Sequence, residues 1–325
     1  MKVYLTAAVT FDHSLTAIPE FQTLADADKF GVHHVTDDPN TADLILFVDA
    51  HQHPDWRLVA IKNHPLVKKW PQKVLLYNER DRPWCTLPGL YVSMPQSTFD
   101  PSRQRACAYH RTLNTIVVPG SIVPDLLYSF MGAKSHKVRD RLFCLPHPNG
   151  FVEDTSAVNF FDLSDNAETK ARVQTQKQRF VEIIARSRFV LCPRGHGTSS
   201  IRLYEVLAAG RVPVIISDEW VPPPGPDWGN CTLRWPEAAV SRLPAFLETQ
   251  EPQFPVFASA AKSAYDDWFA PNVLFHRMME SCCQLLELGQ KPRASFFDPL
   301  NRQYLRYALS DAKSAAMQMM KGVKV

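Results

Sequence analysis

Short apolar runs along this chain alternate with longer stretches that fit amphipathic helices. Residues 2–6 alternate between apolar and polar positions like a strand, and residues 42–49 (ADLILFVD) form the continuous apolar run of a buried parallel strand. Residues 15–30 between them fit a helix, and further strands are predicted over residues 73–77 and 90–93. Strands joined by helical spacers in this way predict βα units on a parallel sheet with helices on its faces.

The same pattern begins again near residue 116. Strands are predicted over residues 126–131, 189–192 and 212–217, and helices over residues 136–143, 174–186, 199–209, 237–248, 259–269 and 273–288. The polar stretch 146–169 is predicted to be a loop. Apolar residues recur at helical spacing near the C-terminus, at Leu305, Leu309, Ala312, Ala316 and Met319. We therefore expect an α/β unit over residues 1–115, a second over residues 116–300, and an amphipathic helix over residues 301–325.

Length and composition narrow the class of protein. The 325 residues predict two domains, and 45% hydrophobic with 21% charged residues exclude a disordered or fibrous chain. The net charge of +3 is too small over this length to indicate a nucleic-acid partner. No apolar run reaches the ~18 residues that cross a bilayer, so no integral membrane segment is expected. The seven cysteines are scattered without C-x-x-C spacing, so we expect a reducing, cytoplasmic location.

The clearest chemistry lies in residues 187–219, SRFVLCPRGHGTSSIRLYEVLAAGRVPVIISDE. This block predicts a strand, a glycine-containing turn, a helix and a second strand. Gly195 and Gly197 allow the backbone to approach a ligand closely, and the N–H groups near residues 198–200 form an anion site at the helix start. The block therefore indicates a phosphate-binding turn.

Arg202 and Glu205 lie three residues apart, on one face of the predicted helix. An arginine can pair with phosphate oxygens and a carboxylate one turn on can accept two ribose hydroxyls, so the pair fits a nucleoside diphosphate. Alternatively, the two side chains form a surface ion pair of about 0.2–0.5 kcal/mol, and the glycines merely shape a turn. The combination of glycine turn, hydroxyl-rich helix start and Arg-x-x-Glu favours the nucleotide site.

The same stretch resembles a known family. CPRGHGTSSIRLYEVLAAGRVPVIISD, within residues 189–218, is similar to the C-terminal signature of the exostosin-like glycosyltransferases, a glycine turn before an S/T-x-R-x-x-E helix and then A-x-G-x-x-P-V-I-x-S-D. ADLILFVDA at residues 42–50 resembles the A-D-x-F-x-V-P segment of that family, and YSFMGAKSHKVRDRLF at residues 128–143 resembles its F-x-G segment and basic helix. Between residues 49 and 125 the similarity transfers no residue.

The resemblance implies an α/β protein of GT-B architecture, in which two Rossmann-like domains with parallel sheets face a cleft. The helix of residues 301–325 would cross back to the N-terminal domain. A nucleoside-diphosphate sugar would bind mainly to the C-terminal domain, and a glycan or other hydroxyl-bearing acceptor would enter from the N-terminal one. The implied role is sugar transfer in glycan biosynthesis.

Matched residue by residue, the family motif puts Glu205 on the donor ribose and Arg202 near the diphosphate. Arg139, in HKVRDRL, matches a basic position that neutralises the leaving diphosphate, although it could be a solvated helix arginine. Asp218 ends a strand at the cleft, although it could instead cap the next segment. The donor-binding set is then Arg194, His196, Gly197, Thr198, Ser199, Arg202, Glu205 and Asp218.

In GT-B enzymes, arginines and helix dipoles usually supply the charge that a metal supplies elsewhere. The D-x-D triplet of residues 26–28 falls in a predicted helix rather than at a strand end, so we expect no metal and no cofactor besides the donor substrate. An inverting reaction, which we favour over a retaining one, needs a base for the acceptor hydroxyl. Candidates at strand ends are Glu79 and Asp49, followed by Asp81 and His51, and each could instead be a polar loop residue.

Two other functions remain open from the sequence. His51 and His53 form an H-x-H pair after a buried strand, as in the metal sites of amidohydrolase barrels, and the chain length would suit one β/α barrel. Against this, the later histidines fall mostly in predicted loops or helices. A third alternative is a non-catalytic protein of the GT-B fold that binds a nucleotide sugar or a glycan.

Overall fold

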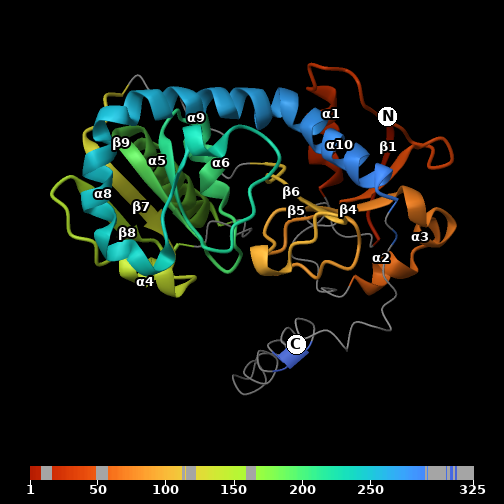
Figure 1. The fold of residues 1–325 in the computed structure, drawn as a ribbon, viewed down its shortest axis with the longest axis horizontal. Coiled ribbons are helices and arrows are strands. Elements are labelled where there is room, and N and C mark those ends of the chain that lie inside the picture. Colours follow the sequence, from red (N-terminus) through yellow and green to blue (C-terminus); the bar gives the residue numbers. More distant parts are fainter. Residues whose placement is uncertain are drawn as a thin grey trace.

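The computed structural model describes most of the chain. The described residues are 1–8, 17–48, 58–111, 114, 122–158, 166–289, 291, 305, 308, 309 and 312. Their strands form two separate parallel sheets, each with helices on both faces (Figure 1). The predicted pair of α/β units is confirmed, and a single β/α barrel is wrong for this chain.

The first sheet has the order β2-β1-β3-β4-β5-β6, and neighbouring strands run parallel. Its strands are β1 (Lys2–Thr6), β2 (His34–Val35), β3 (Leu44–Phe47), β4 (Val74–Asn78), β5 (Gly89–Tyr91) and β6 (Gln104–Ala106). The helices beside it are α1 (Ile18–Asp26), α2 (Val59–Asn63) and α3 (Pro65–Lys69). Both faces of β3 and β4 are covered, which explains why their sequences are apolar throughout.

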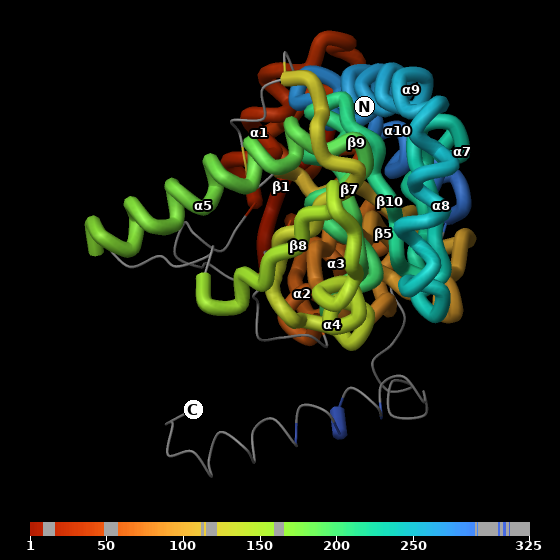
Figure 2. Tube along the Cα trace, turned by 90° about the vertical axis from the view of Figure 1, so that its left-hand side faces the viewer, coloured from red at the N-terminus to blue at the C-terminus, as the bar shows by residue number. Residues whose placement is uncertain are grey.

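The second sheet has the order β11-β10-β9-β7-β8 and is also parallel. Its strands are β7 (Leu126–Gly132), β8 (Gly150–Asp154), β9 (Ser187–Pro193), β10 (Val212–Ile216) and β11 (Leu233–Arg234). Its helices are α4 (Lys137–Leu142), α5 (Ala167–Arg186), α6 (Ile201–Ala208), α7 (Trp228–Cys231) and α8 (Leu243–Gln250). Apolar residues of α5 and α6 pack on one face, and those of α4 and α8 on the other. The first turns of α5 project from the body of the molecule (Figure 2).

The main error in the predicted elements is β8, which lies inside the stretch 146–169 that was predicted to be a loop. This strand is at the edge of the sheet, pairs only with β7 among the described strands, and keeps its side chains half-buried. An edge strand with polar residues lacks the apolar run that marks a central strand of a parallel sheet.

Two long helices connect the two units: α9 (Phe254–Trp268) and α10 (Pro271–Glu287) run along the top in Figure 1. Buried residues of α10, including Phe275 and Met279, share one apolar cluster with Phe21 of α1 and Leu90 of β5. A helix therefore crosses back to the N-terminal domain, and it is α10. Most of residues 301–325 lies outside the described residues, and Leu305 and Leu309 are 48% and 63% exposed.

The loop after β5 connects the two units directly. Pro95 forms an antiparallel bridge with Trp220, and the N–H of Gln96 donates to the carbonyl of Glu219 at 2.9 Å. The hydroxyl of Thr198 donates to the carbonyl of Met94 at 3.0 Å. Within the described parts of the chain, no helix combines the length and apolar character needed to span a bilayer.

Candidate functional site

A pocket of about 270 Å³ lies where the carboxyl ends of both sheets face each other. The second unit lines it with residues that end β7 or follow β7, β8 and β9, with the start of α6, with Phe180 of α5 and with Arg139 of α4. The first unit contributes Asp81, Tyr109 and Asn114, which follow β4 and β6. Carboxyl ends of parallel strands are where ligands bind in open α/β folds, so this pocket is the candidate site.

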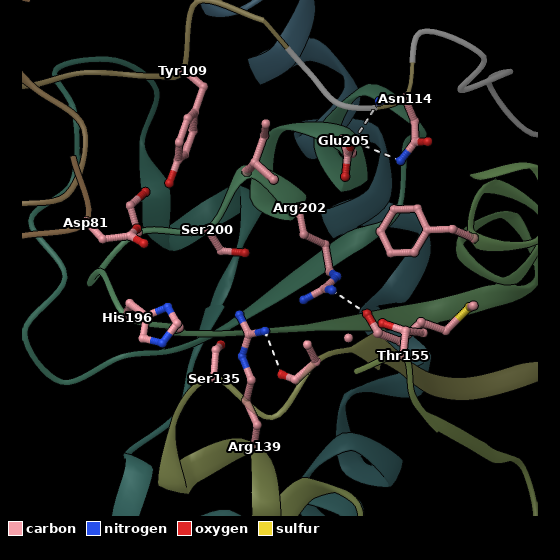
Figure 3. A pocket seen from close by; sticks show the side chains of 17 residues that line it. Asp81, Tyr109, Asn114, Ser135, Arg139, Thr155, His196, Ser200, Arg202 and Glu205 are labelled. Carbon is pink, nitrogen blue, oxygen red and sulfur yellow. Dashed lines mark hydrogen bonds between the residues drawn. The ribbon is translucent and has the colours of Figure 1, made fainter. Parts of the chain in front are cut away.

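Arg202 lies at the centre of the pocket (Figure 3) and is 8% exposed. Its Nη2 donates to the carbonyl of Met131, whereas no described residue accepts a hydrogen bond from its Nε or Nη1. Its guanidinium lies over the rings of Phe130 and Phe180, at 4.8 and 5.4 Å from their centroids. Burial lowers the pKa of this arginine. The predicted alternative of a surface ion pair is therefore wrong for Arg202.

Arg139 lies beside Arg202 in Figure 3, and its guanidinium is held by the glycine turn. Its Nε donates to the carbonyl of Arg194 at 2.9 Å, its Nη1 to Ala133 at 3.1 Å, and its Nη2 to Pro193 at 3.3 Å. Burial, and then the charge of Arg202, lower the pKa of Arg139 to about 9. Among the described residues neither guanidinium forms an ion pair, so two like charges share a partly desolvated pocket.

Glu205 is 1% exposed and is held by a residue from the first unit. Its Oε1 accepts two hydrogen bonds from Asn114, one from the backbone N–H and one from Nδ2, both at 3.0 Å. Figure 3 shows both bonds at the upper edge of the pocket. Glu205 and Arg202 lie one turn apart on α6 and both line the pocket, which is the placement that the motif predicts.

The glycine turn packs tightly against both units. A Cβ on Gly197 would lie 2.1 Å from Ser93 Oγ and 2.6 Å from Asp81 Oδ1, and a Cβ on Gly195 would lie 3.1 Å from Arg139 Nη2. The approach of 2.1 Å explains why position 197 needs glycine, whereas a Cβ at position 195 would only require Ser135 and Arg139 to shift by a few tenths of an ångström. The N–H of Ser199 donates to Ser93 Oγ at 3.1 Å, so this predicted donor to phosphate is already engaged.

Only some of the other residues predicted to contact the donor line the pocket. His196 and Ser199 line the pocket, whereas Gly197, Thr198, Arg194 and Asp218 do not. Asp218 and Glu237 exchange hydrogen bonds of 3.1 Å between each backbone N–H and the other carboxylate. Asp218 therefore fixes a loop, as its alternative interpretation predicted.

Of the two candidate bases that follow β4, Asp81 lines the pocket and Glu79 does not. Glu79 does not line the pocket, because its Oε1 accepts from the hydroxyl of Tyr77, the N–H of His110 at 3.0 Å and His110 Nδ1 at 2.7 Å. Burial raises the pKa of Glu79, but the hydrogen bonds from His110 outweigh it and hold the pKa below its usual range. Asp81 does line the pocket, close to Tyr109 and His196 (Figure 3).

Asp49, His51 and His53 lie outside the described residues. The D-x-D triplet closes α1, where Asp28 accepts from the N–H of Gly31 at 3.1 Å, and it does not line the pocket. Within the described ranges, no group of three or more His, Cys, Asp or Glu side chains is arranged to hold a metal ion.

Tyr109 and Asn114 are among the pocket residues that sequence reasoning missed. Burial raises the pKa of Tyr109 well above its ordinary value, and the charge of Asp81 adds to the effect. Both residues follow the short strand β6, which has no apolar run, so no pattern in the sequence marks a strand end there.

Comparison with known proteins finds similarity over part of this chain. Residues 125–250 match the Exostosin GT47 domain. Over 88 residues the chain is 34% identical to an exostosin-1 homolog of Caenorhabditis elegans, which covers 26% of this chain and 23% of that protein. Over 62 residues it is 37% identical to a probable glycosyltransferase of Arabidopsis thaliana, which covers 19% of this chain and 12% of that protein.

The chain thus spans less than a quarter of the length of these two relatives. Among solved structures, a glycosyltransferase from Rickettsia africae aligns with a TM-score of 0.43 and 10% identity, covering 88% of this chain and 98% of that one. The domain match contains the glycine turn, Arg202, Glu205 and Arg139, whereas the resembling segment at residues 42–50 lies outside it. Residues 125–250 are therefore similar to the Exostosin GT47 domain, and the rest of the chain lies outside that match.

Proposed function

We propose that this protein transfers a sugar from a nucleoside-diphosphate sugar to a hydroxyl group of a glycan or another acceptor. The observation that carries the proposal is the pair of buried guanidinium groups, Arg139 and Arg202, around one pocket. Two like charges in a desolvated site are costly unless a bound anion compensates them. The unpartnered Nε and Nη1 of Arg202 provide donors for such an anion, and Glu205 on the next turn offers a carboxylate to ribose hydroxyls.

In the proposed reaction, the diphosphate lies between Arg139 and Arg202, and its charge grows as the glycosidic bond breaks. Fixed cations that already face this position stabilise the leaving group without reorganising. Because these arginines supply the charge and the D-x-D triplet lies elsewhere, we propose that transfer needs no divalent metal.

For an inverting reaction we assign the base to Asp81. Its carboxylate lines the pocket, whereas Glu79 lies outside it and accepts hydrogen bonds from Tyr77 and His110 with Oε1. Glu79 then has a positioning role, because His110 directly follows Tyr109 of the pocket. Entry of the acceptor from the first unit, where Asp81 lies, would bring its hydroxyl to this base.

We also propose a reducing, cytoplasmic compartment, because all seven cysteines are free thiols. Cell fractionation with a marker for each compartment tests the location, and recovery in a secretory fraction would contradict it.

The activity test is a panel of uridine and guanosine diphosphate sugars incubated with the protein and excess EDTA. Slow release of UDP or GDP, accelerated by a suitable hydroxyl acceptor, is expected. Tight binding without any turnover would instead identify a binding protein, and turnover that returns only with added divalent cation would overturn the metal-free mechanism.

A further inference from the structure

Asn114 is the residue that connects the first unit to the proposed ribose site. It is 8% exposed and lines the pocket, and it is separated from Glu205 by 91 positions in the sequence. Its backbone N–H and its Nδ2 both donate to Oε1 of Glu205, at 3.0 Å. Two donors from one residue fix both the position and the direction of the carboxylate.

The remaining polar atom of Asn114 is unsatisfied. Its Oδ1 is buried, and none of the described residues donates a hydrogen bond to it. A buried acceptor without a donor costs about 1–3 kcal/mol, so such an atom in a pocket calls for a donor from a ligand. The orientation of the amide is fixed, because only Nδ2 can donate to the carboxylate of Glu205.

We propose that Asn114 is a second nucleoside-binding residue, which orients Glu205 with its two N–H donors and accepts a ribose hydroxyl with Oδ1. The inference rests on the proposed function and extends it, because it places part of the donor site on the first unit. A ribose has two adjacent hydroxyl donors, and the amide oxygen and the carboxylate form two adjacent acceptors. The donor nucleoside would then be held by both units.

Calorimetry on the full chain tests this with five probes: UDP, GDP, their two 2′-deoxy forms, and inorganic pyrophosphate. Asn114→Ala should weaken binding of the preferred nucleoside diphosphate roughly tenfold, as expected for the loss of a hydrogen bond together with the fixed carboxylate. Pyrophosphate affinity should stay unchanged, because Arg139 and Arg202 are untouched. The preference of the wild type for ribose over 2′-deoxyribose should shrink in the variant.

Two further variants separate positioning from folding. Asn114→Asp keeps the size of the side chain but puts a carboxylate against Glu205, so it should lose at least as much nucleotide affinity as the alanine variant. Asn272→Ala, an exposed asparagine in the first turn of α10, is the matched control and should behave as wild type. In a double-mutant cycle, adding Asn114→Ala to Glu205→Ala should cost little more affinity than Glu205→Ala alone.

The outcomes distinguish the two proposals. If the wild type binds neither UDP nor GDP, the proposed function fails and this inference fails with it. If the wild type binds one of them and Asn114→Ala, folded to the same melting temperature, binds it equally well with the same ribose preference, the role of Asn114 is refuted and the proposed function stands.

Discussion

Replacing Arg202 with methionine should leave the fold nearly as stable as wild type while destroying the anion site. Replacing buried charged groups by apolar side chains of similar volume is often neutral or stabilising by about 1–4 kcal/mol. Against this, the variant loses the hydrogen bond to Met131, about 1 kcal/mol, and the contacts with Phe130 and Phe180, about 1 kcal/mol each. At the middle of that range, about 2 kcal/mol, the gain offsets most of the loss of about 3 kcal/mol, so the free energy of unfolding should fall by only about 1 kcal/mol.

Nucleotide binding should respond very differently to Arg202→Met. Each charge-assisted hydrogen bond contributes about 1.5–3 kcal/mol, so the loss of even one bond to the diphosphate lowers affinity about 10- to 100-fold. The affinity for the bare nucleoside should change far less, because the proposed partner of Arg202 is the diphosphate. Calorimetry with UDP and GDP, and with their nucleosides, measures both quantities.

Arg211 provides a matched control, because it is a buried arginine whose donors are all engaged. Its Nε and Nη2 donate to the carbonyl of Ala185 at 3.0 and 2.7 Å, and Nη1 donates to Gly210 at 3.2 Å. Arg211→Met should cost about 1–3 kcal/mol of stability, because it leaves buried carbonyls unsatisfied, and should not alter nucleotide affinity. A large loss of stability in Arg202→Met together with unchanged UDP and GDP affinity would refute this reasoning.

Four further predictions follow from the described contacts. Gly197→Ala, whose Cβ would lie 2.1 Å from Ser93 Oγ, should cost about 1–3 kcal/mol in denaturant unfolding and weaken nucleotide binding, whereas Gly225→Ala, with no neighbour nearer than 3.5 Å, should do neither. Asp81→Asn should lower kcat about 10²- to 10⁴-fold with unchanged nucleotide affinity, and near-normal turnover would exclude it as the base. Turnover of the sugar nucleotide should be the same in excess EDTA as with added Mg²⁺, and an absolute dependence on the cation would contradict this. Burial raises the pKa of the Cys192 thiol from 9.0 to about 12, so above pH 9 this thiol ionises in the unfolded chain but not in the folded one, and the free energy of unfolding falls as pH rises. Cys192→Ala should reduce that fall by about 1.4 kcal/mol per pH unit. An unchanged dependence of stability on pH would contradict this.

The strands that form the centres of both sheets were predictable because both of their faces are buried. Continuous apolar runs such as those of β3 and β10 are then required, and such runs are visible in the sequence. β8 and β6 lie at sheet edges or are very short, and their composition carries no such mark. The strands at the sheet edges could therefore be identified only in the structure.

The candidate site likewise has residues that were predictable from the sequence and residues that were not. Arg202 and Glu205 were predictable because one helix presents both on one face, a local relation that spacing reveals. The choice between Glu79 and Asp81 as the base was not predictable. It depends on the hydrogen bonds between Glu79 and His110, 31 positions away, which hold the Glu79 carboxylate outside the pocket. The hydrogen bonds from Asn114 to Glu205 join residues 91 positions apart, and they form only because the two units pack against each other.

The most direct test of the central claim is a crystal structure of the protein grown with UDP or GDP, whichever binds more tightly. The account predicts density for a diphosphate between Arg139 and Arg202 and a ribose within hydrogen-bonding distance of Glu205, without a metal ion bridging the phosphates. A nucleotide bound elsewhere, or one whose phosphates avoid both arginines, would contradict the claim that this pocket is the donor site.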